Sequence, residues 1–378
     1  MKKEIDITIF GATGFTGTLI SEYFANRKPN LKWAIAGRNR SKLESLKSRL
    51  EKSQKGLDIP IIIAEDQASL DVMAQKSKSI ITTVGPYIKY GEGVVKACTQ
   101  NSCDYLDLTG EPAFVKMIRE KYHKIAEKNG VVILTCCGFD SIPADLGTYY
   151  TCKELDKTEA TVRCYVSTNG KPSGGTWNSA LLIMSQTGMG DARHITGNAT
   201  RSIPEITDSI HEQKQLSTWA LPMPVVDVAM VEKSHEVNHY ADRFQYAQYF
   251  ASDNLPKTLA IAAGVGAVFA GSRVPFIRDM LGRLLPPGEG PSLEERNQST
   301  FELTFIGESP GKKVRATVSG GDPGYTETSK IISEAAITLF ETRDKVKIAG
   351  VLSPASVLKD ELIENLQRAG IRFNKSKA

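Results

Sequence analysis

A glycine-rich turn follows the first apolar run of the chain, and it restricts the fold more than any other feature. Ile5–Phe10 leads directly into Gly11-Ala-Thr-Gly-Phe-Thr-Gly17. A first glycine permits a tight turn, a second lets phosphate oxygens approach backbone N–H groups, and a third lets the following helix pack closely on the strand. A helix beginning near Phe15 would offer N–H groups and a positive dipole end to a pyrophosphate.

This turn predicts a dinucleotide site. The residues that we expect to bind the cofactor there are Gly11, Thr13, Gly14, Phe15, Thr16 and Gly17. The spacing is GxxGxxG rather than the commoner GxGxxG, so a plain glycine turn between a strand and a helix stays open as an alternative.

The end of the second predicted strand indicates which dinucleotide is bound. Leu31–Ala36 runs into Gly37-Arg38-Asn39-Arg40, where an NAD site usually has Asp or Glu. A guanidinium can instead bind a 2′-phosphate through two charge-assisted hydrogen bonds and stack on adenine. We therefore predict NADP, bound by Arg38 and Asn39, with Arg40 left open.

Further apolar runs at 59–64 and 79–84 continue an alternating α/β pattern, which predicts a Rossmann-type parallel sheet. Ligands in such sheets lie beyond the carboxyl ends of the strands. Val84, Gly85 and Pro86 follow one of these ends, so we expect them to pass beneath the nicotinamide.

The residues next to this segment are the candidates for acid–base chemistry. Tyr87 is the first candidate for a proton donor, with Tyr90 as its substitute, although a lining role for Tyr87 is equally open. Asp107 follows another strand end, where a carboxylate could orient a substrate or water. The neighbouring Glu111 is expected to cap the helix after Pro112.

Several longer motifs in one order resemble the saccharopine dehydrogenase-like oxidoreductases, and within them the trans-acting enoyl reductases of bacterial lipid biosynthesis. These motifs are Val84-Gly-Pro-Tyr87, Tyr90-Gly91, Tyr105-Leu-Asp-Leu-Thr-Gly-Glu111, Cys137-Gly-Phe-Asp-Ser-Ile-Pro-Ala-Asp-Leu-Gly147, Ser173-Gly-Gly-Thr-Trp177, Pro286-Pro-Gly-Glu-Gly-Pro-Ser292, Ser319-Gly-Gly-Asp-Pro-Gly-Tyr325 and Gly350-Val-Leu-Ser-Pro354. The resemblance covers nearly the whole chain, and family membership constrains fold more than substrate.

Length and pattern predict two domains in the 378 residues. We expect an NADP-binding Rossmann domain over 1–150 and an α+β substrate domain over 151–324, because alternating segments such as Phe301–Phe305 and Val314–Val318 suggest a mostly antiparallel sheet. The resemblance implies that the second domain also dimerises and that about 325–378 returns to the first domain. The helix at 326–340 and a turn at 350–354 match that return.

Composition excludes several classes of protein. The formal charge is only +4, and no tract combines clustered basic residues with aromatics, so no nucleic-acid partner is expected. The six cysteines form no CxxC pair, and no metal site is predicted. The first apolar run breaks at Gly11, too early for a signal peptide, so we expect a cytoplasmic protein with reduced thiols.

One segment could bring the protein to a membrane surface. The fifteen residues 258–272 carry no charge and are mostly apolar, with Gly and Ala throughout. As a helix they would span roughly 22 Å, less than the roughly 30 Å of a bilayer core. An interfacial, lipid-facing element over 258–271, helped by nearby arginines, and a buried helix packed through small residues stay open as alternatives.

These observations predict an NADP-dependent oxidoreductase. The resemblance implies an enoyl reductase that acts by hydride transfer on a lipid or polyketide acyl chain. One alternative is a saccharopine-type reductase that acts on an amino-acid imine, which would need basic residues to bind two or more carboxylates. Another is a non-catalytic, lipid-associated protein that retains the nucleotide domain.

Overall fold

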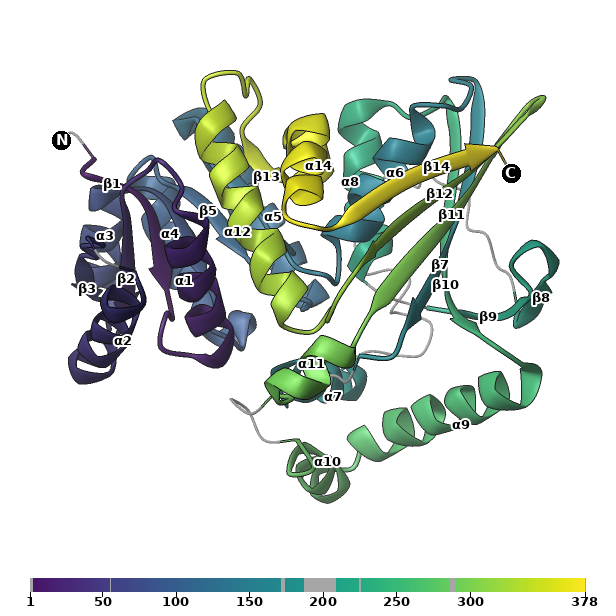
Figure 1. Cartoon of the computed structure of the whole chain (residues 1–378), viewed down its shortest axis with the longest axis horizontal. Coiled ribbons are helices and arrows are strands. Elements are labelled where there is room, and N and C mark those ends of the chain that lie inside the picture. Colours follow the sequence, from purple (N-terminus) through teal and green to yellow (C-terminus); the bar gives the residue numbers. More distant parts are fainter. Residues whose placement is uncertain are drawn as a thin grey trace. The chain divides into compact units, whose positions relative to one another are not determined.

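The computed structural model divides the chain into two compact units. The first comprises Met1–Phe139 and Tyr325–Ala369, and the second comprises Asp140–Gly324 and Gly370–Ala378. The structure describes residues 3–54, 56–170, 174–186, 209–223, 226–285 and 290–377. The motifs at 173–177 and 286–292 therefore lie partly outside the described residues. Figure 1 traces the whole chain.

A sheet of seven parallel strands forms the centre of the first unit, in the order β13-β6-β5-β4-β1-β2-β3. Apart from β13, this is the strand order of a Rossmann fold. The predicted doubly wound sheet is therefore confirmed. The strands are β1 (Ile5–Phe10), β2 (Trp33–Gly37), β3 (Ile61–Ile63), β4 (Ser77–Thr82), β5 (Asp104–Asp107), β6 (Val132–Leu134) and β13 (Gly350–Leu352).

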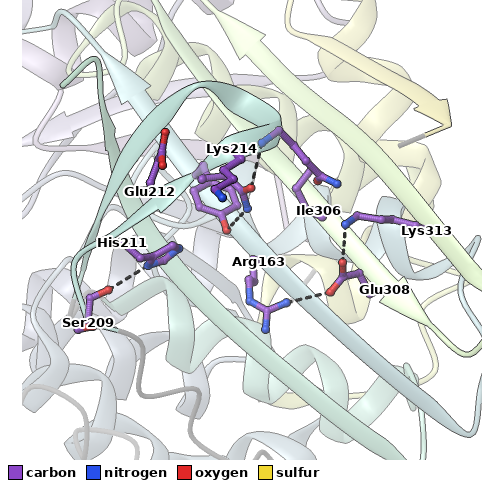
Figure 2. A pocket seen from close by; sticks show the side chains of 11 residues that line it. Arg163, Ser209, His211, Glu212, Lys214, Ile306, Glu308 and Lys313 are labelled. Carbon is purple, nitrogen blue, oxygen red and sulfur yellow. Dashed lines mark hydrogen bonds and ion pairs between the residues drawn. The ribbon is translucent and has the colours of Figure 1, made fainter. Parts of the chain in front are cut away.

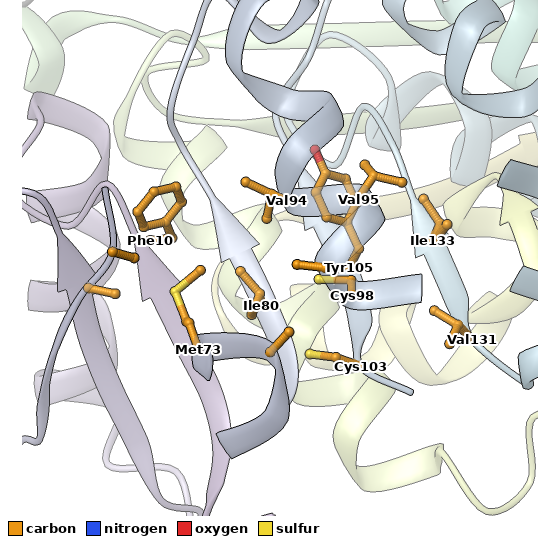
Figure 3. Packing of buried hydrophobic residues seen from close by; sticks show 14 of the residues in the cluster. Phe10, Met73, Ile80, Val94, Val95, Cys98, Cys103, Tyr105, Val131 and Ile133 are labelled. Carbon is orange, nitrogen blue, oxygen red and sulfur yellow. The ribbon is translucent and has the colours of Figure 1, made fainter. Parts of the chain in front are cut away.

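Helices connect these strands and cover the sheet. They are α1 (Phe15–Arg27), α2 (Arg40–Ser53), α3 (Gln67–Lys76), α4 (Tyr87–Gln100), α5 (Pro112–Asn129), α12 (Thr326–Thr342), α13 (Pro354–Val357) and α14 (Lys359–Arg368). α1 packs against α2 and α12, whereas α4 packs against α3 and α5. Figure 3 shows the core beneath α4, where Val94, Val95 and Cys98 meet Ile80 and Tyr105 of the sheet.

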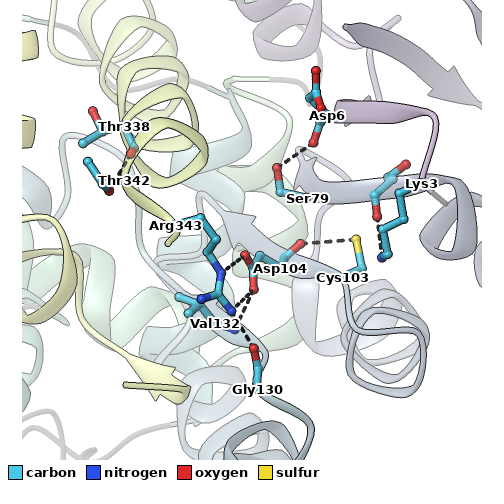
Figure 4. A network of polar contacts seen from close by, with 11 residues as sticks. Lys3, Asp6, Ser79, Cys103, Asp104, Gly130, Val132, Thr338, Thr342 and Arg343 are labelled. Atoms are coloured by element: carbon cyan, nitrogen blue, oxygen red, sulfur yellow. Dashed lines mark hydrogen bonds and ion pairs between the residues drawn. The ribbon is translucent and has the colours of Figure 1, made fainter. Parts of the chain in front are cut away.

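A buried carboxylate fastens the C-terminal return to the sheet of the first unit. Arg343, which follows α12, donates from Nε to Oδ2 of Asp104 at 2.6 Å, and it also donates to the carbonyl oxygen of Gly130. Asp104 Oδ1 accepts from the backbone N–H of Val132 at 2.8 Å. This network, drawn in Figure 4, joins β5, β6 and the end of α12.

The second unit contains a mixed sheet in the order β14-β12-β11-β7-β10-β9-β8, in which β7 and β10 are the one parallel pair among the described strands. α6 and α8 pack on this sheet. Its elements are α6 (Ile142–Cys152), β7 (Glu159–Thr168), α7 (Gly174–Gln186), β8 (His211–Gln213), β9 (Thr218–Pro222), α8 (Val226–Asn238), β10 (Arg243–Ser252), α9 (Leu255–Ser272), α10 (Pro275–Gly282), α11 (Leu293–Gln298), β11 (Phe301–Ser309), β12 (Lys312–Gly320) and β14 (Arg372–Lys377).

The structure differs from the expected organisation in three places, two of which are domain limits. The first boundary falls after Phe139 rather than near 150, because α6 packs on the strands and α8 of the second unit. Residues 350–352 form β13 rather than a turn, since they pair with β6. The last residues do not stay with the first unit, because β14 pairs with β12.

Candidate active site

The first glycine of the turn is required by the neighbouring strand end. Gly11 has φ +84°, and a Cβ there would lie 2.6 Å from Oγ1 of Thr83 and 2.9 Å from Cγ2 of Val84. Thr83 also donates its backbone N–H to the carbonyl oxygen of Phe10 at 3.0 Å. The segment after β4 is thus held against the turn after β1.

The other two glycines of the turn have different roles: Gly17 permits close packing of the helix, and Gly14 leaves space for a ligand. A Cβ on Gly17 would overlap the carbonyl oxygen of Gly11, so this glycine sets how closely α1 approaches the turn. A Cβ on Gly14 would meet only that same oxygen, at 3.3 Å, and Gly14 is exposed. The space beside Gly14 is therefore open to a ligand phosphate.

The N-terminus of α1 lies at this open space. The helix begins at Phe15, as predicted. Its N-cap residue is Gly14, which has no side chain to cap the first N–H groups of the helix. Thr13 and Thr16 are half-buried on either side. The ring of Phe15 packs edge-on against Tyr325 with 4.5 Å between centroids. Backbone N–H groups and the helix dipole thus face the position expected for a pyrophosphate.

Of the three residues 38–40, which follow β2 and were predicted to contact the cofactor or left open for it, Arg38 has a charged group without an ion pair among the described residues. It is also exposed. The guanidinium of Arg40 lies 3.8 Å from Glu44. Asn39 uses its side-chain oxygen to cap α2, accepting from the N–H of Lys42 at 3.0 Å. The structure therefore favours Arg38 for a phosphate contact, and it gives the Asn39 side chain a capping role that the sequence did not predict.

Tyr87 does not have the environment of a proton donor. It begins α4 rather than preceding it, and its side chain is buried. Its hydroxyl donates to the carbonyl oxygen of Thr82 at 3.1 Å and accepts from the N–H of Leu108 at 3.3 Å. Burial raises its pKa well above the usual value. The prediction of a catalytic Tyr87 is corrected to a structural role, whereas Tyr90 in the same turn is 55% exposed.

Asp107 is also corrected to a structural role. Its carboxylate is fully buried and accepts from the N–H groups of Thr109 at 3.0 Å and Cys136 at 2.9 Å, and from the hydroxyl of Tyr105 at 2.8 Å. Burial raises the pKa of Asp107 to about 6, although these hydrogen bonds act in the opposite direction and lower it. The carboxylate therefore ties the loops after β5 and β6 together rather than facing a substrate.

Glu111 caps a helix, but a different one from the one expected. Its two carboxylate oxygens accept from the N–H groups of Tyr87 at 2.8 Å and Ile88 at 2.9 Å, which lie in the first turn of α4. The negative charge also complements the dipole of that helix. Nothing in the sequence links residue 111 to a helix 24 positions earlier; only the adjacency of β4 and β5 brings them together.

A polar cavity of about 430 Å³ in the second unit was not predicted from the sequence. Figure 2 shows Arg163 and Lys313 in its lining, both directed at Glu308, at 3.0 Å and 2.6 Å respectively. The lining also contains Glu212 and Lys214. The carboxylate of Glu308 pairs with both Arg163 and Lys313. These two cations are therefore not both available to bind the carboxylates of a dicarboxylate substrate.

Comparisons with known proteins agree with this geometry. Residues 7–134 match the saccharopine dehydrogenase NADP binding domain. The chain is 30% identical to a saccharopine dehydrogenase-like oxidoreductase of Homo sapiens over 99% of its own length and 97% of that protein. It is also 30% identical to a trans-acting enoyl reductase of Mycobacterium bovis (strain BCG / Pasteur 1173P2), over 98% and 97% respectively.

The fold has a solved counterpart as well. The apo saccharopine dehydrogenase (L-Glu forming) of Saccharomyces cerevisiae matches 99% of this chain and 100% of its own, with a TM-score of 0.57 at 11% identity. Together with the matched NADP binding domain and the full-length relative, this fold defines the chain as a two-unit, nucleotide-dependent oxidoreductase. The chain belongs to the saccharopine dehydrogenase-like oxidoreductase family.

NADP fits the first unit on the evidence of the residues themselves. The match at 7–134 contains the whole glycine turn and Arg38. The open space at Gly14, the N-terminus of α1 and the exposed guanidinium provide the groups that an NADP pyrophosphate and 2′-phosphate require. The cofactor of this protein is therefore NADP.

Proposed function

We propose that this NADP-dependent oxidoreductase is an enoyl reductase that reduces a carbon–carbon double bond in a lipid or polyketide acyl chain. The observation that carries the proposal is its identity with a trans-acting enoyl reductase over nearly the full length of both proteins. The coverage includes the second unit and not only the nucleotide-binding unit. The acyl substrate is also consistent with the exposed apolar helices of the second unit.

The protein's own groups would act at two ends of the cofactor. Gly14 and the first turn of α1 bind the pyrophosphate, and Arg38 binds the 2′-phosphate. Val84–Pro86, held against Gly11, supports the nicotinamide end. When bound, NADPH supplies a hydride to the β-carbon of the enoyl group.

Reduction of the double bond also requires one proton at the α-carbon and stabilisation of the charge that develops on the carbonyl oxygen. Tyr87 and Asp107 are buried and hydrogen-bonded to the protein, so neither is offered for this step. Tyr90 lies on the exposed side of the first turn of α4, next to the Val84–Pro86 segment. We assign it the role of proton donor.

The alternative substrate is an amino-acid imine, which would carry two or more carboxylates. The cationic side chains Arg163 and Lys313 of the second unit share the carboxylate of Glu308, and Arg243 pairs with Glu159 at 2.6 Å. Because these basic residues are already paired with carboxylates of the protein, they give little support for binding a dicarboxylate. The similarity to an enoyl reductase gives more support for an acyl substrate.

The test follows NADPH oxidation by the purified full-length protein with two substrate panels. One contains 2-enoyl thioesters of increasing chain length, and the other contains imines formed from 2-keto acids and amino acids. Turnover of the thioesters that improves with chain length is the expected result. Turnover of the imines alone would overturn the proposal, and NADPH binding without turnover of either panel would favour the non-catalytic alternative.

A further inference from the structure

The long apolar helix α9 is exposed on the second unit. Only Thr258 and Ser272 are buried among its 18 residues, and a Cβ on Gly264 or Gly266 would meet no atom within 4 Å. By length and composition the helix could cross a membrane, yet only 11% of it is buried. The alternative of a buried helix packed through small residues is therefore wrong.

The following helix extends this apolar surface. Phe276 and Met280 of α10 and Leu284 beyond it recur every four residues, which places them on one face, and they are 79%, 53% and 67% exposed. The opposite face is already occupied: a Cβ on Gly271 of α9 would lie 3.0 Å from Ile277 and 3.5 Å from Leu281. Ile277 and Leu281 therefore pack α10 on α9, and the exposed apolar residues on the other face take no part in that packing.

Basic residues flank the exposed apolar surface. Residues 253–285 contain four basic residues, Lys257, Arg273, Arg278 and Arg283, and two acidic ones, Asp279 and Asp253, of which Asp253 pairs with Lys257 at 2.7 Å. Arg273 lies over the ring of Phe269 at 4.4 Å. Neither Arg278 nor Arg283 forms an ion pair in the part of the chain that the structure describes. Apolar side chains beside unneutralised arginines match the boundary between headgroups and acyl chains of an anionic bilayer.

We propose that the α9–α10 hairpin, residues 255–285, docks the second unit onto an anionic lipid bilayer by lying in its interface. The surface charge favours lipid over a second copy of this chain, since two such hairpins in contact would bring like charges together. The inference does not depend on which substrate the protein reduces.

The connections of the hairpin argue against a membrane span. α9 is about 27 Å long at 1.5 Å per residue, whereas α10, with eight residues, reaches only about 12 Å. β10 before the hairpin and β11 after it belong to the same sheet, so the chain would have to cross back. A non-helical return through hydrocarbon would leave backbone groups without hydrogen bonds. The hairpin therefore lies on one side of the bilayer.

The test measures sedimentation of the full-length protein with vesicles of 7:3 phosphatidylcholine and phosphatidylglycerol, and with phosphatidylcholine alone. These proportions are about those of a moderately anionic membrane. The apolar variant combines Phe276→Ser, Met280→Ser and Leu284→Ser. Its matched control combines Val72→Ser, Ile125→Ser and Val237→Ser, three exposed apolar residues outside the hairpin. A charge variant, Arg278→Gln with Arg283→Gln, is matched by Lys96→Gln with Lys128→Gln, both exposed.

The expected result is binding to the anionic vesicles that falls at least tenfold in the apolar variant and about fivefold per arginine in the charge variant. Both controls should bind like the original protein, and all variants should retain NADPH binding. Equal loss in the controls would overturn the proposal. So would an apolar variant that changes only the oligomeric state, or a protein that alkaline carbonate and high salt fail to remove from the vesicles.

Discussion

Replacing Arg38 by Ala tests the assignment of the 2′-phosphate site most directly. Hydrogen bonds to charged groups contribute about 1.5 to 3 kcal/mol each, which corresponds to about a tenfold to a 150-fold change in Kd. Arg38 is exposed and has no competing ion pair in the described chain, so solvent weakens its contacts while nothing needs to be broken to form them. We therefore expect the lower end of this range, with NADPH affinity about tenfold weaker.

The assay is titration of the Arg38→Ala variant with NADPH and, separately, with NADH. NADH lacks the 2′-phosphate, so its affinity should be unchanged, and the difference between the cofactors should shrink as salt is added. Arg40→Ala is the matched control, because that guanidinium is already near Glu44. The reasoning fails if both cofactors lose affinity equally, or if Arg40→Ala has the larger effect on NADPH.

Four further substitutions give separate expectations. Gly17→Ala should lower the free energy of unfolding by about 1 to 3 kcal/mol through overpacking, whereas Gly14→Ala should leave the thermal midpoint unchanged but weaken NADPH binding measured by titration. Tyr87→Phe should lower the free energy of unfolding by about 1 to 3 kcal/mol and leave kcat unchanged. Tyr90→Phe should lower kcat by at least about 100-fold and leave the stability unchanged. The reverse pattern would make Tyr87 the proton donor instead.

The raised pKa of Asp107 predicts that the free energy of unfolding depends on pH. Its pKa rises from 3.8 to about 6 on folding, so its contribution is fully present below pH 4 and is lost as the pH rises through 6, by about 3 kcal/mol. In denaturant titrations from pH 4 to 7, Asp107→Asn should remove this decline, and an unchanged pH profile would contradict the burial argument.

The parallel sheet and its glycine turn were accessible from the sequence because they depend on local patterns. Alternating strands and helices favour a parallel sheet with right-handed crossovers, and the helix at 112–129 begins at Pro112 and ends before Gly130, both of which are local signals. The glycine spacing predicted which backbone positions must lack a Cβ, and Gly11 and Gly17 both have atoms where that Cβ would be.

The side-chain roles at the strand ends were not accessible in the same way. A tyrosine after Gly-Pro can point to solvent or into the core, and the direction depends on where α4 begins. In the fold, Leu108 from the next strand end provides a donor for the Tyr87 hydroxyl, and Glu111 caps the same helix. Both contacts join segments more than 20 residues apart, and no periodicity or spacing specifies them.

The three crossings of the chain between its units mean that neither unit corresponds to a continuous piece of the gene. A fragment that stops near 150 would lack α12 and β13, so the edge of β6 would lose its neighbouring strand and the carboxylate of Asp104 would lose Arg343. A fragment of the second unit that ends at 324 would lack β14, the strand that borders β12. Truncation of this chain must therefore preserve residues 325–378, even though the residues predicted to bind the cofactor all lie within the first ninety.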